Sequence, residues 1–174
     1  MHVPKVLICL LAIAASSAWA GTAHEHGVAR LDVAVDGPRV SIAMTSPLEN
    51  LLGFERAPRN DAEHKKVATL LAILRDGAKL FRVDAAAACV PGNVELESAV
   101  LKLGAAQVAT AGTHHDLAAH WEFSCAKAAQ ITALELGLFD ALPRLQRIEV
   151  QAVAPQWQRK LTLKRPARRV PLNR

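Results

Sequence analysis

The alternation of apolar and polar residues between Ala29 and Met44 is the feature that most limits how this chain can fold. Residues 36–39 read Asp-Gly-Pro-Arg, which is a turn sequence, and apolar residues occupy every second position on both sides of it: Leu31, Val33, Val35, then Val40, Ile42, Met44. A period of two on either side of a turn predicts a β-hairpin with one buried face.

The remaining chain adds further strand patterns and one long helix pattern. We expect strands over residues 94–103, 120–125, 131–136, 148–153 and 157–163, the last two joined as a hairpin. A helix is expected over about residues 61–76, because Asn60 is an N-cap residue, Glu63 lies at the capping-box position and Gly77 follows. Its apolar residues are spaced i, i+3, i+4, i+7: Val67, Leu70, Leu71, Leu74.

These patterns define the expected fold class. We predict an α+β protein, mainly an antiparallel β-sheet built from hairpins, with one amphipathic helix packed on it. A short helical turn is expected within residues 46–55, ending at Gly53, and another turn of helix or a bulge over residues 138–143. Residues 85–88 and 104–112 have loop composition.

The first 20 residues have the pattern of a cleaved signal peptide. Lys5 precedes an apolar run of about a dozen residues, shorter than the roughly 20 that a membrane span needs, and residues 18–20 read Ala-Trp-Ala, a cleavage-site pattern. Residues 21–174 would then form a single exported domain with a basic C-terminal tail, since residues 164–169 read KRPARR. We expect no membrane span.

The charge of the chain does not indicate a nucleic-acid partner. The formal net charge of the whole chain is +5, but aromatic residues make up only 4% and there is no tyrosine, so stacking platforms for bases are absent. We therefore expect no nucleic-acid binding. The oligomeric state does not follow from the sequence.

Two cysteines, Cys89 and Cys125, remain after the proposed cleavage. An even count in an exported chain predicts a disulfide, which would stabilise the fold by roughly 3–4 kcal/mol in the chain-entropy model. A pair of zinc thiolates is the less favoured alternative in an oxidising compartment.

Five of the six histidines outside the signal peptide lie in two short segments, AHEHG and THHDLAAH: His24, His26, His114, His115 and His120. If the first strand extends backwards, His24 and His26 share the exposed face of Arg30 and Asp32, with Cα atoms about 6.6–6.8 Å apart. Two imidazoles at this spacing can bind one zinc ion, and the second segment would supply further ligands. The alternative is that these five histidines are solvated surface residues with no metal-binding role, as we expect for His64.

Catalytic patterns are missing from the sequence. It contains no HExxH, no GxSxG and no P-loop, and nothing orients Glu25 or Glu122 as the base of a zinc hydrolase. We therefore expect a protein that is not an enzyme. Imidazole sites also bind copper and nickel, copper usually more tightly than zinc, so the pattern alone does not select the metal.

Four segments resemble one family: HEHGVARLDVAVDG, SPLENLLGFERAP, HWEFSC and LGLFDALPRLQRIEVQAVAPQWQRKLTL. They are similar to the DUF2796 family of ZrgA-like periplasmic zinc-binding proteins, from about His24 to Leu172. The resemblance implies a periplasmic zinc-binding protein that supports zinc uptake, with a zinc ABC importer or its binding protein as the partner. It also implies that His24, His26 and His120 stand at positions that supply ligands.

Two departures from the family pattern lower the expected zinc capacity. The long His- and Asp-rich insertion of the relatives is reduced here to THHD, and their GFEH motif reads Gly53-Phe54-Glu55-Arg56. We therefore expect one zinc site, holding or delivering zinc, rather than a high-capacity buffer. The alternative function is an envelope protein–protein interaction module in which the histidines are incidental.

Overall fold

The computed structural model describes residues 25–104 and 115–173, which form two sheets and several helices. The larger sheet has six strands in the order β4 (Cys89–Glu97), β5 (Asp116–Cys125), β2 (Arg39–Pro47), β1 (Val28–Asp36), β7 (Arg147–Ala154) and β8 (Trp157–Lys164). The smaller sheet has the order β3 (Phe81–Val83), β6 (Ala133–Leu136) and β9 (Arg169–Pro171). The α-helices are α1 (Leu48–Leu52), α2 (Asp61–Arg75), α3 (Gly77–Leu80) and α4 (Leu138–Ala141), with 3-10 turns at Ala85–Ala87 and Ala128–Gln130.

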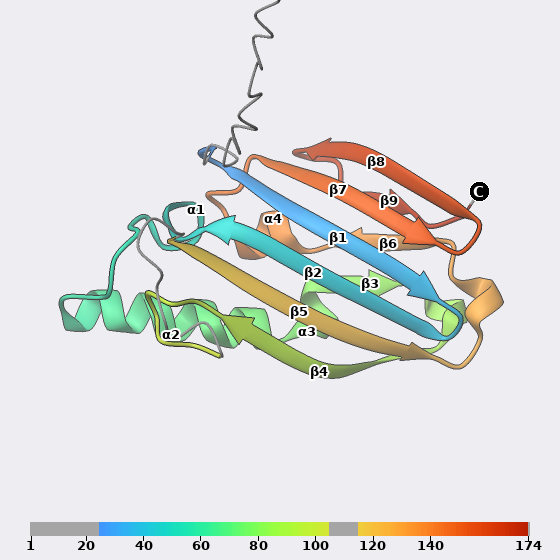
Figure 1. Cartoon of the computed structure of the whole chain (residues 1–174), viewed down its shortest axis with the longest axis horizontal. Coiled ribbons are helices and arrows are strands. Elements are labelled where there is room, and N and C mark those ends of the chain that lie inside the picture. The colour runs from blue at the N-terminus through green and yellow to red at the C-terminus, as the bar shows by residue number, and fades with distance from the viewer. Residues whose placement is uncertain (1–24, 105–114, 174) are drawn as a thin grey trace, which may run out of the picture.

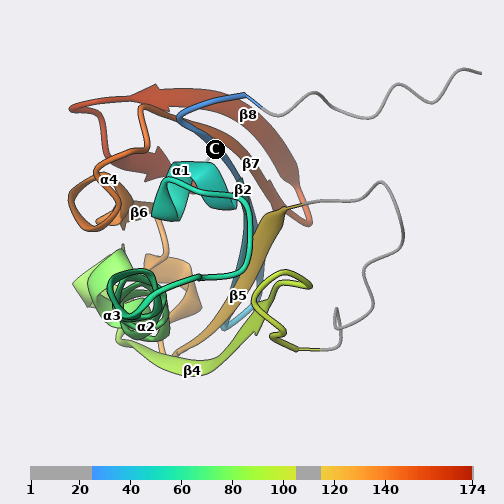
Figure 2. The same cartoon turned by 90° about the vertical axis from the view of Figure 1, so that its left-hand side faces the viewer.

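The six-stranded sheet is curved, and its inner face covers the helices and the small sheet (Figures 1 and 2). The first hairpin has the predicted register, in which Val33 pairs with Ile42 and Asp36 with Arg39. Leu31, Val33 and Ile42 are at most 1% exposed, so the alternation did identify the core face. The core therefore lies between the two sheets.

The large sheet is mainly antiparallel, as expected, but it contains one parallel pair of strands. Strands β1 and β7 are parallel, with Leu31 opposite Val150. After α4 the chain returns to the end of the sheet where β1 starts, and the carbonyl of Gly27 accepts hydrogen bonds from the backbone N–H of Gln146 (2.7 Å) and Arg147 (3.0 Å). The two hairpins β1–β2 and β7–β8 are thereby joined side by side in one sheet.

The α+β class is correct, but the described residues contain several helices, one of them long. The long helix α2 begins where predicted, because the Asn60 side chain accepts a hydrogen bond from the backbone N–H of Glu63 (3.0 Å). Of its four apolar stripe residues, Leu70 and Leu74 are buried and the other two are half-buried.

Gly77 does not end α2 in the way expected. The helix stops at Arg75 with Asp76 as its C-cap, and Gly77 is the first residue of α3. A Cβ at Gly77 would lie 2.8 Å from Cδ1 of Trp121, so the missing side chain makes room for this buried indole. Trp121 in turn donates a hydrogen bond to the carbonyl of Leu74 (2.7 Å).

The bounds of several strands also differ from those predicted, and β5, for example, begins at Asp116 rather than residue 120. Strand β4 begins at Cys89 rather than residue 94 and ends at Glu97, because Ser98 pairs with Leu103 across a tight turn in which Lys102 has a positive φ of 54°. Strand β6 begins only at Ala133, since a 3-10 turn precedes it. Most of the expected loop 104–112 lies outside the described residues.

The predicted disulfide is present between Cys89 and Cys125, which pair across β4 and β5. It joins the edge strand to its neighbour at the end of the sheet opposite His115.

The basic run 164–169 is exposed, yet it is part of the fold rather than a free tail. The Arg165 guanidinium donates hydrogen bonds to the carbonyls of Leu145 (3.0 Å) and Leu142 (3.3 Å), and Arg168 forms an ion pair with Asp140. Arg169 begins β9. Within residues 25–104 and 115–173, no helix combines the length and hydrophobicity needed to cross a membrane.

Candidate metal site at one end of the large sheet

The two histidine-bearing segments meet at the same end of the six-stranded sheet. His26 precedes β1, and His115 precedes β5. Only β2 lies between β1 and β5, so the two segments are two strand spacings apart, about 10 Å. Since both side chains are exposed, they are accessible to a metal ion at this end.

Helix α1 binds both segments from one side. The backbone N–H of Leu48 donates a hydrogen bond to the carbonyl of His115 (2.8 Å). Two residues further on, the Asn50 side chain binds the backbone on either side of His26. The short helix from the SPLENLLGFE segment therefore fixes the relative positions of the two backbones.

Asn50 is 3% exposed and makes three hydrogen bonds to this backbone. Its Oδ1 accepts from the N–H of Gly27 (2.6 Å), and its Nδ2 donates to the carbonyls of Val28 (2.9 Å) and Glu25 (3.2 Å). Gly27 has a φ of +75°, a conformation that favours glycine. His26 thus lies in a turn, and the expectation that it continues the exposed face of β1 is wrong.

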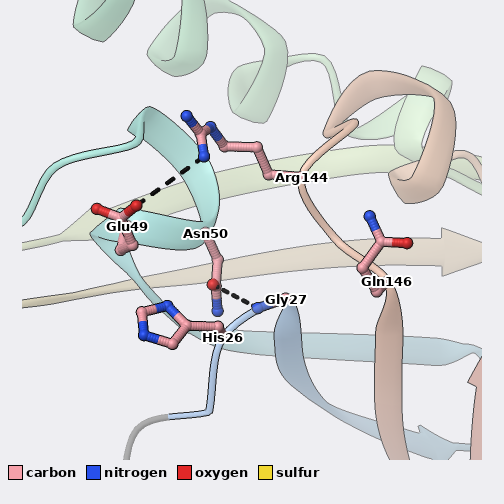
Figure 3. A pocket seen from close by; sticks show the side chains of 6 residues that line it. All are labelled: His26, Gly27, Glu49, Asn50, Arg144 and Gln146. Atoms are coloured by element: carbon pink, nitrogen blue, oxygen red, sulfur yellow. Dashed lines mark hydrogen bonds and ion pairs between the residues drawn. The ribbon is translucent and has the colours of Figure 1, made fainter.

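His26 and Glu49 line one polar cleft of about 240 Å³, together with Gly27, Asn50, Arg144 and Gln146 (Figure 3). Arg144 lies on the other side of Glu49, with its Nη1 3.9 Å from Glu49 Oε1. The cleft therefore contains an imidazole, a carboxylate and, beside the carboxylate, a guanidinium.

Glu25, next to His26, is bound to the opposite side of the turn. Its carboxylate accepts a hydrogen bond from the Arg147 guanidinium, which also contacts Glu149 (3.2 Å). The hydrogen bond to Glu25 raises the pKa of Arg147, so the guanidinium stays charged. This carboxylate is occupied and is not a free metal donor.

His115 has a carboxylate partner in the GFER segment. Its Nδ1 lies 3.5 Å from Glu55 Oε2, and both side chains are more than one-third exposed. Two donors of a tetrahedral zinc ion with bonds of 2.0–2.1 Å are about 3.3–3.4 Å apart. The pair therefore needs little movement to bind one zinc ion.

Arg56, the residue after Glu55, has a structural role next to this pair. Its two terminal nitrogens bind both carboxylate oxygens of Glu63 (2.7 and 2.8 Å), and its guanidinium lies over the Phe54 ring. The hydrogen bonds from Arg56, and then that from the Arg59 backbone, lower the pKa of Glu63 to about 2. This ion pair ties the segment carrying Glu55 to α2.

His120 lies further along β5, away from His115. Its Nε2 is 2.7 Å from the Ser41 hydroxyl in the middle of the outer sheet face. It lies five residues along β5 from His115, or about 17 Å in an extended strand. His24 and His114 fall outside the described residues, and within the rest no group of three His, Cys, Asp or Glu side chains is arranged to hold a metal ion.

Three residues of this site, Glu49, Asn50 and Glu55, were not predicted as site residues from the sequence. Asn50 could have been suspected, since it lies in SPLENLLGFERAP, one of the four segments that carry the family resemblance. Nothing in the local sequence marks Glu55 as a site residue, because only the fold brings it beside His115 at the start of β5.

The structure is thus that of a small β-rich protein with exposed imidazoles and carboxylates, side chains of the types that bind zinc, at one end of its large sheet. Residues 23–172 match the family described as ZrgA family zinc uptake protein, so the chain belongs to that family. A search of the curated proteins found no match.

Proposed function

We propose that this chain is exported to the periplasm, binds zinc at the His26–His115 end of the large sheet, and holds or delivers zinc in support of zinc uptake, without catalysis. Family membership and the disulfide support a zinc-handling protein of an oxidising compartment. A zinc ABC importer or its binding protein is the proposed partner.

The observation that carries the proposal is the common attachment of both histidine segments to α1. Leu48 and Asn50 hold the backbones of His115 and His26. Glu55 stands at a zinc-compatible distance from His115, and Glu49 shares a cleft with His26. In sequence, His24 and His114 adjoin these positions, and we propose them as further ligands.

Calorimetric zinc titration of the metal-free mature protein tests the proposal. We expect binding near 1:1, weakened more than tenfold when His26 and His115 are both replaced with Ala. His64→Ala, a change of an exposed imidazole on α2, is the matched control and should bind as the wild type does. Parallel titrations with copper and nickel determine the metal preference.

Two results would contradict the proposal. Absence of zinc binding by the wild type would favour the interaction-module alternative. An unchanged affinity in the double variant would place the site elsewhere, with His120 as the next imidazole to replace.

A further inference from the structure

The cleft beside His26 contains a cation that the zinc proposal does not use. Arg144 is exposed, and its guanidinium lies close to Gly53. A Cβ on Gly53 would be 2.5 Å from Arg144 Nη2 and 2.9 Å from Cζ. Gly53 therefore both ends α1 with a φ of +84° and leaves the space that Arg144 occupies.

From this position the guanidinium faces the carboxylate that is available to a metal in the cleft. Arg144 Nη1 is 3.9 Å from Glu49 Oε1, and the side chain of Glu49 is 32% exposed. Figure 3 shows Arg144 on one side of Glu49 and the His26 ring on the other. A dication bound by His26 and Glu49 would have to share this carboxylate with Arg144 and would experience its positive charge.

We infer that the Arg144 guanidinium competes with zinc for the Glu49 carboxylate, and that it thereby lowers the zinc affinity of the cleft and favours zinc release. This inference rests on the proposed zinc binding and adds how the same site is regulated. When zinc binds, Glu49 turns from Arg144 to the metal; when zinc leaves, the guanidinium takes the carboxylate back. The arrangement suits a protein that must hand its metal on, because part of the cost of losing the metal is offset by the restored ion pair.

The test compares zinc titrations of the wild type and the Arg144→Gln variant. Two such charges a few ångströms apart at a hydrated surface interact weakly, so we expect a gain in affinity of about three- to tenfold. The gain should shrink as salt is raised, because exposed charges are screened over about 8–10 Å.

Two further variants make the comparison specific. Arg39→Gln removes the same charge at the far end of β2, about 26 Å along the strand from Pro47, and should leave the affinity unchanged. Glu49→Gln removes the shared carboxylate, and in that background Arg144→Gln should have little effect. Thermal unfolding of each variant confirms that it is folded.

Each outcome decides the inference. If the wild type binds zinc and Arg144→Gln leaves the affinity unchanged or weakens it, the competition is overturned but the zinc proposal is not. An equal gain with and without Glu49 also overturns it, because the charge would then act without the shared carboxylate. If the Arg144→Gln variant binds zinc and the wild type does not, the competition is supported. If neither the wild type nor the variant binds zinc, both the competition and the zinc proposal are overturned.

Discussion

Replacing Asn50 with alanine removes the buried contact that holds the His26 turn to α1. Three hydrogen bonds are lost, to the N–H of Gly27 and to the carbonyls of Glu25 and Val28. A typical hydrogen bond contributes about 0.5–1.5 kcal/mol net, and a buried group left without a partner costs about 1–3 kcal/mol. Since Asn50 is 3% exposed, water does not readily replace it, and we expect a loss of about 2–4 kcal/mol in the free energy of unfolding.

Thermal and denaturant unfolding measure this loss directly. For a domain of this size each kcal/mol corresponds to about 2–4 °C, so the midpoint of Asn50→Ala should fall by about 5–15 °C. Asn93→Ala is the matched control, because Asn93 is exposed and its side chain bonds only to Glu95 in the described residues. A midpoint within 1 °C of the wild type for Asn50→Ala would refute the role assigned to this side chain.

Three further predictions concern the remaining fold. Because the pKa of Glu63 is lowered from 4.5 to about 2, its ion pair with Arg56 stabilises the protein fully above about pH 4.5 and is lost as the pH falls towards 2. Glu63→Gln should therefore flatten the acid side of the plot of unfolding midpoint against pH, and an unchanged plot would count against this. Gly77→Ala should destabilise the protein by about 1–3 kcal/mol in denaturant titrations, because its Cβ would meet Trp121, whereas a neutral effect would show that the indole can move. Protein isolated without reductant should show no free thiol from Cys89 or Cys125, and their replacement by Ala should cost about 2–5 kcal/mol; labelling of two thiols per chain would contradict the pairing.

Local patterns predicted the elements whose causes are local. The hairpin register follows from a period of two around a turn, and the start of α2 follows from Asn60 and its hydrogen bond to the N–H of Glu63. The disulfide follows from an even cysteine count in an exported chain.

Features that depend on contacts between distant residues were not predicted. The parallel pairing of β1 and β7 joins segments more than 100 residues apart, and no local pattern in either strand specifies its direction. Gly77 has the composition of a helix end, but its real constraint is the Trp121 ring 44 residues later.

The candidate site shows the same division. The histidine clusters are visible in the sequence, whereas their carboxylate partners and the buried amide of Asn50 become apparent only once α1 is placed against the segments that precede β1 and β5. For His26 the sequence predicts a wrong position: it indicates a strand face, whereas Gly27 turns the chain before β1 begins.

Amide hydrogen exchange with and without zinc tests most directly whether one ion joins the two histidine segments. If it does, zinc should slow exchange at residues 22–28 and 112–120 together, because an ion with ligands from both must order both at once. Exchange in the α2 stripe from Val67 to Leu74 should not change. Protection of only one segment would contradict a shared site at this end of the sheet.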